Sequence, residues 1–260
     1  MCPGYRAPYA GWRRGPRGQG KDRLAVFYWL LKYVLLGPLM RLTCHPKVQG
    51  TEHIPDRGGA ILASNHLAVA DSFFLPLMIR RRLTFLAKRE YFTTPGVRGW
   101  FKRQFFSAAG QVPIDRSSAS AAQAALDTGV RLLADGKLLG IYPEGTRSPD
   151  GRLYKGKTGV ARMALEAGVP VIPVVMVGTD KVSPIGKKMW RPHPVQIRFG
   201  APLDFSRYAG LAGDRFVERS MVDEIMYCLM ELSGQEYVDR YATSIKDREP
   251  PPPQLTLKAS

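Results

Sequence analysis

SNHLAVADSFFLP, residues 64–76, decides the fold of this 260-residue chain, together with the apolar run GAILA at residues 59–63. The apolar run predicts a short buried strand. His66 and Asp71 then stand five residues apart, and five residues of regular α-helix rotate by about 500°, leaving the two side chains about 140° apart. A plain helix therefore separates them, whereas a turn from a strand end into a helix start brings them together. Such strand ends are where open α/β sheets bind ligands.

The spacing of His66 and Asp71 is compatible with two different roles. A carboxylate that accepts a hydrogen bond from one imidazole nitrogen fixes the tautomer and leaves the other nitrogen free as a base. Alternatively, His66 is a hydrogen-bonded core histidine and Asp71 caps a helix. A histidine and an aspartate at this spacing occur often by chance, so the choice depends on the rest of the chain.

Apolar strands alternate with helical segments through the middle of the chain. We expect strands at residues 45–50, 59–63, 83–87, 138–142, 169–175 and 195–199, and helices at 73–82, 97–106, 119–134, 159–166 and 215–232. This alternation predicts an α/β fold with a mostly parallel central sheet flanked by helices. A chain of this length holds one ordinary domain with appendages, and we expect residues 45–245 to form that domain.

The two ends of the chain differ in composition from this domain. Residues 1–23 are rich in Gly, Pro and Arg and residues 246–260 are rich in Pro, so both are expected to be disordered tails. The formal net charge of +16 implies an anionic partner. Since no nucleic-acid-binding motif is visible and much of the charge lies beside an apolar segment, we expect anionic membrane lipid and no nucleic acid.

Residues 24–44 are the most apolar segment of the chain. Lys32 and Gly37-Pro38 interrupt it, so it falls short of the roughly 20 apolar residues that a spanning helix needs. It also lacks the features of a signal peptide. We expect an amphipathic helix, intact or broken at Gly37-Pro38, that docks in one membrane leaflet; the alternative is a buried core helix. Its aromatic side chains suit the headgroup zone of a bilayer: Phe27, Tyr28, Trp29 and Tyr33.

No metal or cofactor is expected from the sequence. The three cysteines, Cys2, Cys44 and Cys228, have neither metal-ligand spacing nor the pattern of a disulfide framework, which favours a reducing compartment. A dinucleotide fingerprint and a Walker loop are also absent from the sequence.

Charged side chains follow several of the predicted strands, and one follows the shorter apolar run at residues 112–114. In a parallel sheet these strand ends share one edge. Arginine fits phosphate with a rigid fork of donors, and lysine adds a point charge. A phosphate held beside a positioned histidine indicates deprotonation of a hydroxyl on a phosphorylated substrate. The residues concerned are His66, Asp71, Lys88, Arg116, Glu144 and Arg147.

Four blocks of the chain resemble, in the same order, the motifs of the glycerolipid acyltransferase family, which includes the 1-acyl-glycerol-3-phosphate acyltransferases. The resemblance covers about residues 45–205, and the 87–90 segment is similar to a shorter family element. Residues before 45 resemble the docking helices of bacterial members only in character. The blocks are Asn65-His66-x4-Asp71, Gly110-x2-Pro113-Ile114-x-Arg116, Pro143-Glu144-Gly145-Thr146-Arg147-Ser148 and Val169-Pro170-Val171-Ile172-Pro173-Val174.

The resemblance implies a role for each matching residue. His66 corresponds to the general base, Asp71 to the residue that orients it, and Arg116 to a ligand of the acceptor's phosphate. Lys88 is a further candidate phosphate contact, and the fourth block is expected to line the site near the acyl donor. Structural alternatives stay open for these charged residues. Glu144 and Arg147 would then simply form an ion pair, and Lys88 and Arg116 would be solvated side chains. The acceptor-site block comprises Glu144, Gly145, Thr146 and Arg147.

The expected activity is transfer of a fatty acyl group from a thioester, acyl-CoA or acyl-carrier protein, to the free hydroxyl of 1-acyl-glycerol-3-phosphate (lysophosphatidate). The product is phosphatidate, and no covalent acyl-enzyme is expected. Glycerol-3-phosphate or another lysophospholipid is the alternative acceptor. A nucleic-acid-binding protein and a catalytically silent lipid-binding relative are the alternatives from other classes. The expected location is the cytoplasmic face of the plasma membrane, with peripheral or monotopic attachment.

Overall fold

The structure, a computed structural model, describes residues 26, 28–88, 96, 111–114, 119–186 and 190–246. The predicted basic tail at 1–23, the helix predicted at 97–106 and the Pro-rich tail beyond Lys246 lie outside the described residues. The proposed domain limits of 45 and 245 therefore stay predictions.

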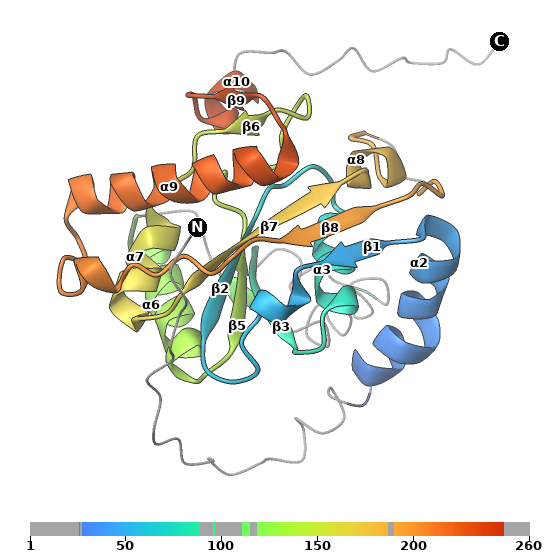
Figure 1. The fold of residues 1–260 in the computed structure, drawn as a ribbon, viewed down its shortest axis with the longest axis horizontal. Helices are drawn as coiled ribbons and strands as arrows, with labels where there is room; N and C mark the ends of the chain where they lie inside the picture. Colours follow the sequence, from blue (N-terminus) through green and yellow to red (C-terminus); the bar gives the residue numbers. More distant parts are fainter. Residues whose placement is uncertain are drawn as a thin grey trace.

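A seven-stranded sheet in the order β1-β8-β7-β2-β5-β3-β4 forms the centre of the fold (Figure 1). The five strands from β7 to β4 run parallel, β8 is antiparallel to β7, and β1 is parallel to β8. The prediction of a mostly parallel α/β sheet is confirmed. The strands are β1 (Lys47–Gln49), β2 (Ala60–Ser64), β3 (Leu83–Lys88), β4 (Gln111–Ile114), β5 (Leu138–Ile141), β7 (Val171–Val177) and β8 (Gln196–Phe199).

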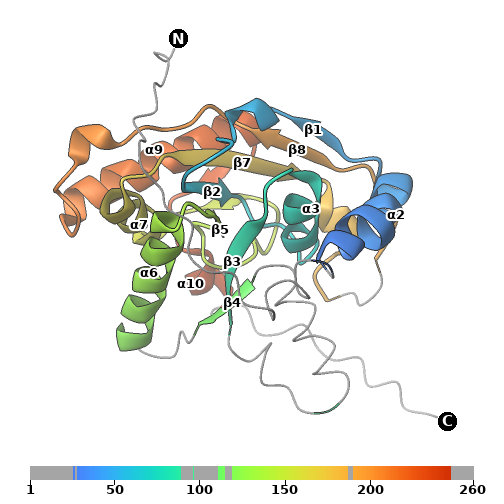
Figure 2. The same ribbon diagram turned by 90° about the horizontal axis from the view of Figure 1, so that it is seen from below.

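Helices cover both faces of this sheet (Figure 2). On one face lie α2 (Leu36–Cys44) and α3 (Asp71–Met78); on the other lie α6 (Ala119–Ala134), α7 (Gly159–Ala167) and α9 (Arg215–Ser233). Shorter elements complete the described chain: η1 (Leu31–Leu35), η2 (Thr51–His53), η3 (Ser206–Tyr208), α8 (Thr179–Val182), α10 (Ala242–Lys246) and a two-stranded sheet of β6 (Leu153–Tyr154) and β9 (Tyr237–Val238).

Strand β2 divides the hydrophobic core into two layers. All five of its residues are buried, and successive side chains point to opposite faces of a strand. Ala60 and Leu62 pack with α2 and α3, whereas Ile61 and Ala63 pack with α7 and α9. A strand buried on both faces in a parallel sheet reads as a continuous apolar run, which is why residues 59–63 identify the centre of the fold.

Helix α3 is shorter than predicted. The sequence suggested a helix from Phe73 to Arg82, but α3 ends at Met78 and Ile79 is extended, with φ −99° and ψ 155°. The chain turns here to enter β3. Arg81 holds this turn, because its guanidinium donates at 2.5–2.8 Å to three backbone carbonyls from two loops, those of Pro55 and Gly58 before β2 and that of Gly136 before β5.

The N-terminal helix runs from 28 to 44 without a break at Gly37-Pro38. The helix widens into the π-helical turn η1, where the N–H of Leu36 donates to the carbonyl five residues earlier. Such a bulge is one way a helix accommodates a proline, which lacks an N–H. A Cβ on Gly37 would overlap the carbonyl oxygen of Lys32, so this widened turn requires glycine.

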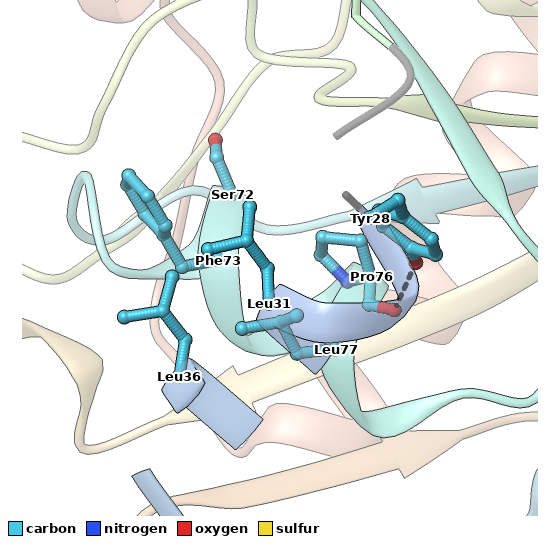
Figure 3. A pocket seen from close by; sticks show the side chains of 7 residues that line it. All are labelled: Tyr28, Leu31, Leu36, Ser72, Phe73, Pro76 and Leu77. Carbon is cyan, nitrogen blue, oxygen red and sulfur yellow. Dashed lines mark hydrogen bonds between the residues drawn. The ribbon is translucent and has the colours of Figure 1, made fainter. Parts of the chain in front are cut away.

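The N-terminal helix has one buried and one exposed apolar side. The buried side packs on α3, and Figure 3 shows the small pocket where they meet, lined by Tyr28, Leu31, Leu36, Ser72, Phe73, Pro76 and Leu77. The helix thus has features of both structures considered from the sequence: one side packs in the core, as in a buried helix, and the other exposes apolar side chains, as in an amphipathic helix. None of the helices among the described residues combines the length and the apolar composition that a membrane span requires. The exposed apolar side comprises Val26, Trp29, Leu30, Tyr33, Val34, Leu35, Leu39 and Leu42.

Lys32 joins this helix to the carboxyl end of α3. Its Nζ lies 3.4 Å from the carbonyl oxygens of Pro76 and Arg80 and also donates to the carbonyl of Ile79. The Tyr28 hydroxyl donates to the Pro76 carbonyl at 2.9 Å. Carbonyls at a helix C-terminus lack intrahelical partners and favour a cation. The N-terminal helix therefore anchors the far end of the helix that begins with Asp71.

We predict that Lys32 makes stability depend on pH. Burial, reinforced by nearby Arg41, lowers the pKa of Lys32 to about 8 from its ordinary 10.5. Between these values the unfolded chain binds more protons, so the free energy of unfolding rises with pH. Urea denaturation measures this free energy. Its value for wild type minus that for Lys32→Met should rise from pH 8 to about 10.5 and stay constant below pH 8. Lys47→Met, at an exposed strand position, corrects for the lost charge. A difference that does not change with pH would contradict this prediction.

Candidate active site

The turn between β2 and α3 places His66 against Asp71. The Nδ1 atom of His66 lies 2.9 Å from Oδ2 of Asp71, and the same oxygen accepts from the N–H groups of Leu67 at 2.7 Å and Ala68 at 2.9 Å. Because a carboxylate accepts hydrogen bonds, Nδ1 carries the proton and Nε2 presents a lone pair. The His66 side chain is 15% exposed while Asp71 is fully buried. This geometry suits a base held by its partner.

Asp71 is buried with only one of its two carboxylate oxygens hydrogen-bonded. Its Oδ1 atom has no hydrogen-bond partner among the described residues. The aspartate is also the first residue of α3, where the positive end of the helix dipole favours a negative charge. A buried polar atom without a partner costs stability, and such arrangements concentrate at functional sites.

Glu144 lies beneath the backbone of His66. Only 1% of the residue is exposed; Oε1 accepts from the N–H of His66 at 3.3 Å and Oε2 from the N–H of Tyr154 at 2.9 Å. The N–H of Ser148 donates to the carbonyl of His66 at 2.7 Å. The 143–148 loop thus binds both backbone polar groups of His66. The sequence assigned Glu144 to the acceptor site, and the structure gives it contacts that position His66.

The exposed part of the same loop carries the other predicted acceptor-site residues. Gly145 has a φ of +74°, a conformation that glycine adopts without strain. Thr146 and Arg147 are half-buried and make further contacts. Arg147 directly precedes Ser148, so its backbone runs next to that of His66.

Lys157 is a cation at this loop that the sequence analysis did not single out. Its N–H donates to the carbonyl of Pro143 at 2.8 Å, and a Cβ added to Gly145 would lie 3.2 Å from its Nζ. The side chain is exposed. The pair of lysines at 155 and 157, soon after the acceptor-site block, is the sequence signal for it.

The strand order brings the predicted strand ends to one edge of the sheet. Strands β2, β5, β3 and β4 are consecutive and parallel. Lys88 is the last residue of β3 and pairs in register with Ile114 of β4, but its side chain lies outside what the structure describes. Arg116 also lies outside the described residues, two positions beyond the end of β4.

The fourth sequence block supports the site from within the sheet. All six residues from Val169 to Val174 are buried, and β7 pairs in parallel with β2, with Pro173 opposite Ala63. The block was expected to line the site near the acyl donor. In the structure these residues form part of the core, next to the strand that carries His66.

Asn65 and Gln235 form a support that sequence reasoning missed. The Asn65 amide binds both the N–H and the carbonyl of Met176, at 2.8 and 3.1 Å, and donates to Oε1 of Gln235 at 2.8 Å. Gln235 in turn donates to the carbonyl of Gly151. Asn65, the residue next to His66, is thus hydrogen-bonded both to β7 and to the segment that follows α9. No local pattern in the sequence relates positions 170 residues apart.

The described residues hold no group of three or more His, Cys, Asp or Glu side chains placed to bind a metal ion. Cys44 is buried and Cys228 is half-buried, and neither of these two described cysteines forms a disulfide. The expectation of no metal or cofactor stays a prediction.

Comparison with known proteins identifies related chains. A family model described as Acyltransferase matches residues 45–177, slightly more than half of the chain. A 1-acyl-sn-glycerol-3-phosphate acyltransferase of Limnanthes douglasii is 33% identical over 159 residues, which cover 61% of this chain and 54% of that protein. A 1-acyl-sn-glycerol-3-phosphate acyltransferase of Bacillus subtilis is 26% identical, and the match covers 64% of this chain and 77% of that protein. The chain spans about half the length of the first of these relatives.

A solved structure shares the fold over most of the chain. It is the 1-acyl-sn-glycerophosphate acyltransferase PlsC from Thermotoga maritima, with a TM-score of 0.60 and 27% sequence identity, and the match covers 84% of each chain. The likeness extends well beyond the residues that the family model matches.

We predict that Glu144→Gln destabilises the protein in the absence of any substrate. An amide has one oxygen, so its NH₂ group must face either the His66 or the Tyr154 N–H, and a buried donor left unpaired costs about 1–3 kcal/mol. Denaturant unfolding measures the loss. Glu166→Gln, which weakens an i,i+4 pair with Arg162, is the matched control and should cost less than about 0.5 kcal/mol. Equal losses in the two variants would contradict the positioning of His66 by Glu144.

Proposed function

The chain belongs to the acyltransferase family, and on that premise we propose that it transfers a fatty acyl group from an acyl thioester to the free hydroxyl of 1-acyl-sn-glycerol-3-phosphate. The observation that carries the proposal is the hydrogen bond between His66 and Asp71 at the end of β2. The acceptor named for the related acyltransferases and for the structural neighbour supports this choice.

The reaction proceeds by direct transfer. His66 accepts the proton of the acceptor hydroxyl at Nε2, and the oxygen attacks the thioester carbonyl carbon. Asp71 stabilises the resulting imidazolium through the Nδ1–H bond. The tetrahedral intermediate then collapses, the carbon–sulfur bond breaks, and the departing thiolate takes the proton back from His66. The products are phosphatidate and a free thiol, and no serine or cysteine nucleophile takes part.

The oxyanion of the intermediate needs hydrogen-bond donors, and the candidates are backbone N–H groups near the helix start after His66 or in the fourth sequence block. The N–H groups of Leu67 and Ala68 donate to Asp71, and that of Gly145 donates to the Tyr142 carbonyl. These three groups are therefore engaged within the protein. The N–H group of Val69, a residue that is 45% exposed in the turn before α3, is the candidate donor.

Positive side chains at the same sheet edge would hold the acceptor's phosphate. We propose this role for Arg116 and Arg147, with Lys88 as a further contact, and Lys157 joins them because of its place beside Gly145. A phosphomonoester suits such a set of cations. Glycerol-3-phosphate and other lysophospholipids are the rival acceptors, and acyl-CoA and acyl-carrier protein are the candidate donors; a panel of acceptors and donors assayed with the purified protein separates them.

We also propose that the exposed apolar side of the N-terminal helix docks on an anionic membrane, at the cytoplasmic face of the plasma membrane. Seven large apolar side chains are exposed along this helix, and Val26 just before it is exposed as well; the net charge of +16 favours anionic lipid. An acceptor with a long acyl chain resides in a bilayer, so docking brings the site to its substrate.

His66→Ala should lower kcat for acyl transfer by about 10²–10⁴-fold, because the general base is lost. Asp71→Asn should also lower kcat, because an amide can present its NH₂ group to Nδ1 and reverse the tautomer. Thermal unfolding should remain cooperative in both variants. His193→Ala, in a loop before β8, is the control and should retain activity. Retention of most of the wild-type turnover by His66→Ala would rule out the proposed role.

Sedimentation with vesicles tests the docking. The protein should bind vesicles of phosphatidylglycerol more tightly than vesicles of phosphatidylcholine, and added salt should weaken the difference. Leu39→Glu with Leu42→Glu should reduce binding to both, because charges replace apolar side chains that are 52% and 74% exposed. Equal binding to neutral and anionic vesicles would contradict the electrostatic part of the proposal, and unchanged binding by the double variant would contradict the apolar part.

A further inference from the structure

The ring of His66 lies in a stack of three aromatic rings. Tyr142 follows β5 directly, and its ring stacks on the imidazole with centroids 3.8 Å apart and an interplanar angle of 9°. The ring of Phe85, on β3, stacks on that of Tyr142 with centroids 5.5 Å apart and an interplanar angle of 19°. Three segments that are distant in the sequence thus contribute one ring each.

A glycine makes room for this stack. Gly140 of β5 pairs in register with Phe85 of β3, and a Cβ on Gly140 would overlap atoms of the Phe85 ring. Any larger residue at position 140 would therefore push Phe85 away from Tyr142. The apolar strand LLGI leaves this space beside the ring that supports Tyr142.

The hydroxyl of Tyr142 fixes the position of its ring. It lies 3.0 Å from Oγ of Ser72, the residue after Asp71 in α3. Burial, together with the negative charge of Asp71, raises the pKa of Tyr142 well above 10, so the hydroxyl remains protonated at the pH of any ordinary assay. Tyr142 therefore does not act as a general base in the reaction. Two adjacent residues of α3 therefore position the imidazole. Asp71 binds its edge directly, and Ser72 holds the Tyr142 ring that stacks on its face.

We propose that Tyr142 is a positioning residue for the acyl transfer, a role that rests on the proposed function. A single hydrogen bond at Nδ1 leaves the imidazole free to swing about that bond, and the stacked ring fixes its plane. With both contacts, Nε2 keeps one direction toward the substrate hydroxyl. A displacement of about 1 Å in a reacting group costs about 10²-fold in rate, so fixing the plane has a large effect on kcat and little on substrate binding.

The kinetic test compares variants that keep or remove the ring. Tyr142→Phe should keep kcat within about threefold, and Tyr142→Leu should lower kcat by about 10- to 100-fold with the KM for lysophosphatidate little changed. Ser72→Ala should resemble Tyr142→Phe, and the double variant should add little, because both remove the same hydrogen bond. Tyr208→Leu, at a half-buried tyrosine beside α9, is the control for loss of a ring elsewhere. If Tyr142→Leu fails to fold, Tyr142→Met replaces it.

NMR detects the stack without any substrate. The face of the Tyr142 ring shields the ring protons of His66, so their resonances should lie upfield in wild type and Tyr142→Phe and return downfield in Tyr142→Leu. The sequence has four histidines, and the signals missing from His66→Ala assign the pair.

The outcomes separate this proposal from the one on which it rests. A wild-type protein that forms no phosphatidate overturns the proposed function, whatever the NMR spectra show. An active wild type with Tyr142→Leu at the same kcat overturns the positioning role alone. Equal losses of kcat in Tyr142→Phe and Tyr142→Leu also overturn it, because the hydroxyl and not the ring would then carry the effect.

Discussion

The site depends on one carboxylate oxygen, Oδ2 of Asp71, which accepts from His66 and from the N–H groups of Leu67 and Ala68. These bonds fold the five-residue turn back on itself and bring together two side chains that a regular helix would separate. The oxygen thus shapes the backbone of the turn and orients the imidazole at the same time. Since α3 begins at Asp71, the direction of this helix follows from the same contact.

Other parts of the fold hold this turn in place from several sides. Glu144 and Ser148 bind the backbone of His66, the Asn65 amide ties the preceding residue to β7, and Lys32 holds the far end of α3. Each contact satisfies backbone groups where a strand or helix ends. Such ends are the least satisfied parts of regular structure, and here the sequence supplies buried polar side chains to them.

Much of this arrangement follows from short-range rules. The continuous apolar run at 59–63 indicated a strand buried on both faces, the rotation of a helix indicated that His66 and Asp71 meet across a turn, and the parallel alternation indicated that several strand ends share an edge. The remaining contacts depend on packing between distant segments. The burial of Glu144, the bond from Asn65 to Gln235 and the early end of α3 beside Arg81 arise only once the sheet order is known, so no local pattern predicts them.

The attachment of Lys32 to the last carbonyls of α3 has a mechanical consequence. Detaching the N-terminal helix would strip those carbonyls of their cation, so these contacts oppose any movement of the helix relative to α3. Any surface that receives Leu39 and Leu42 therefore also sets the height at which His66 stands above it. A hydroxyl at a different depth would have to move to the imidazole, because the contacts of Lys32 oppose a hinge between the N-terminal helix and α3.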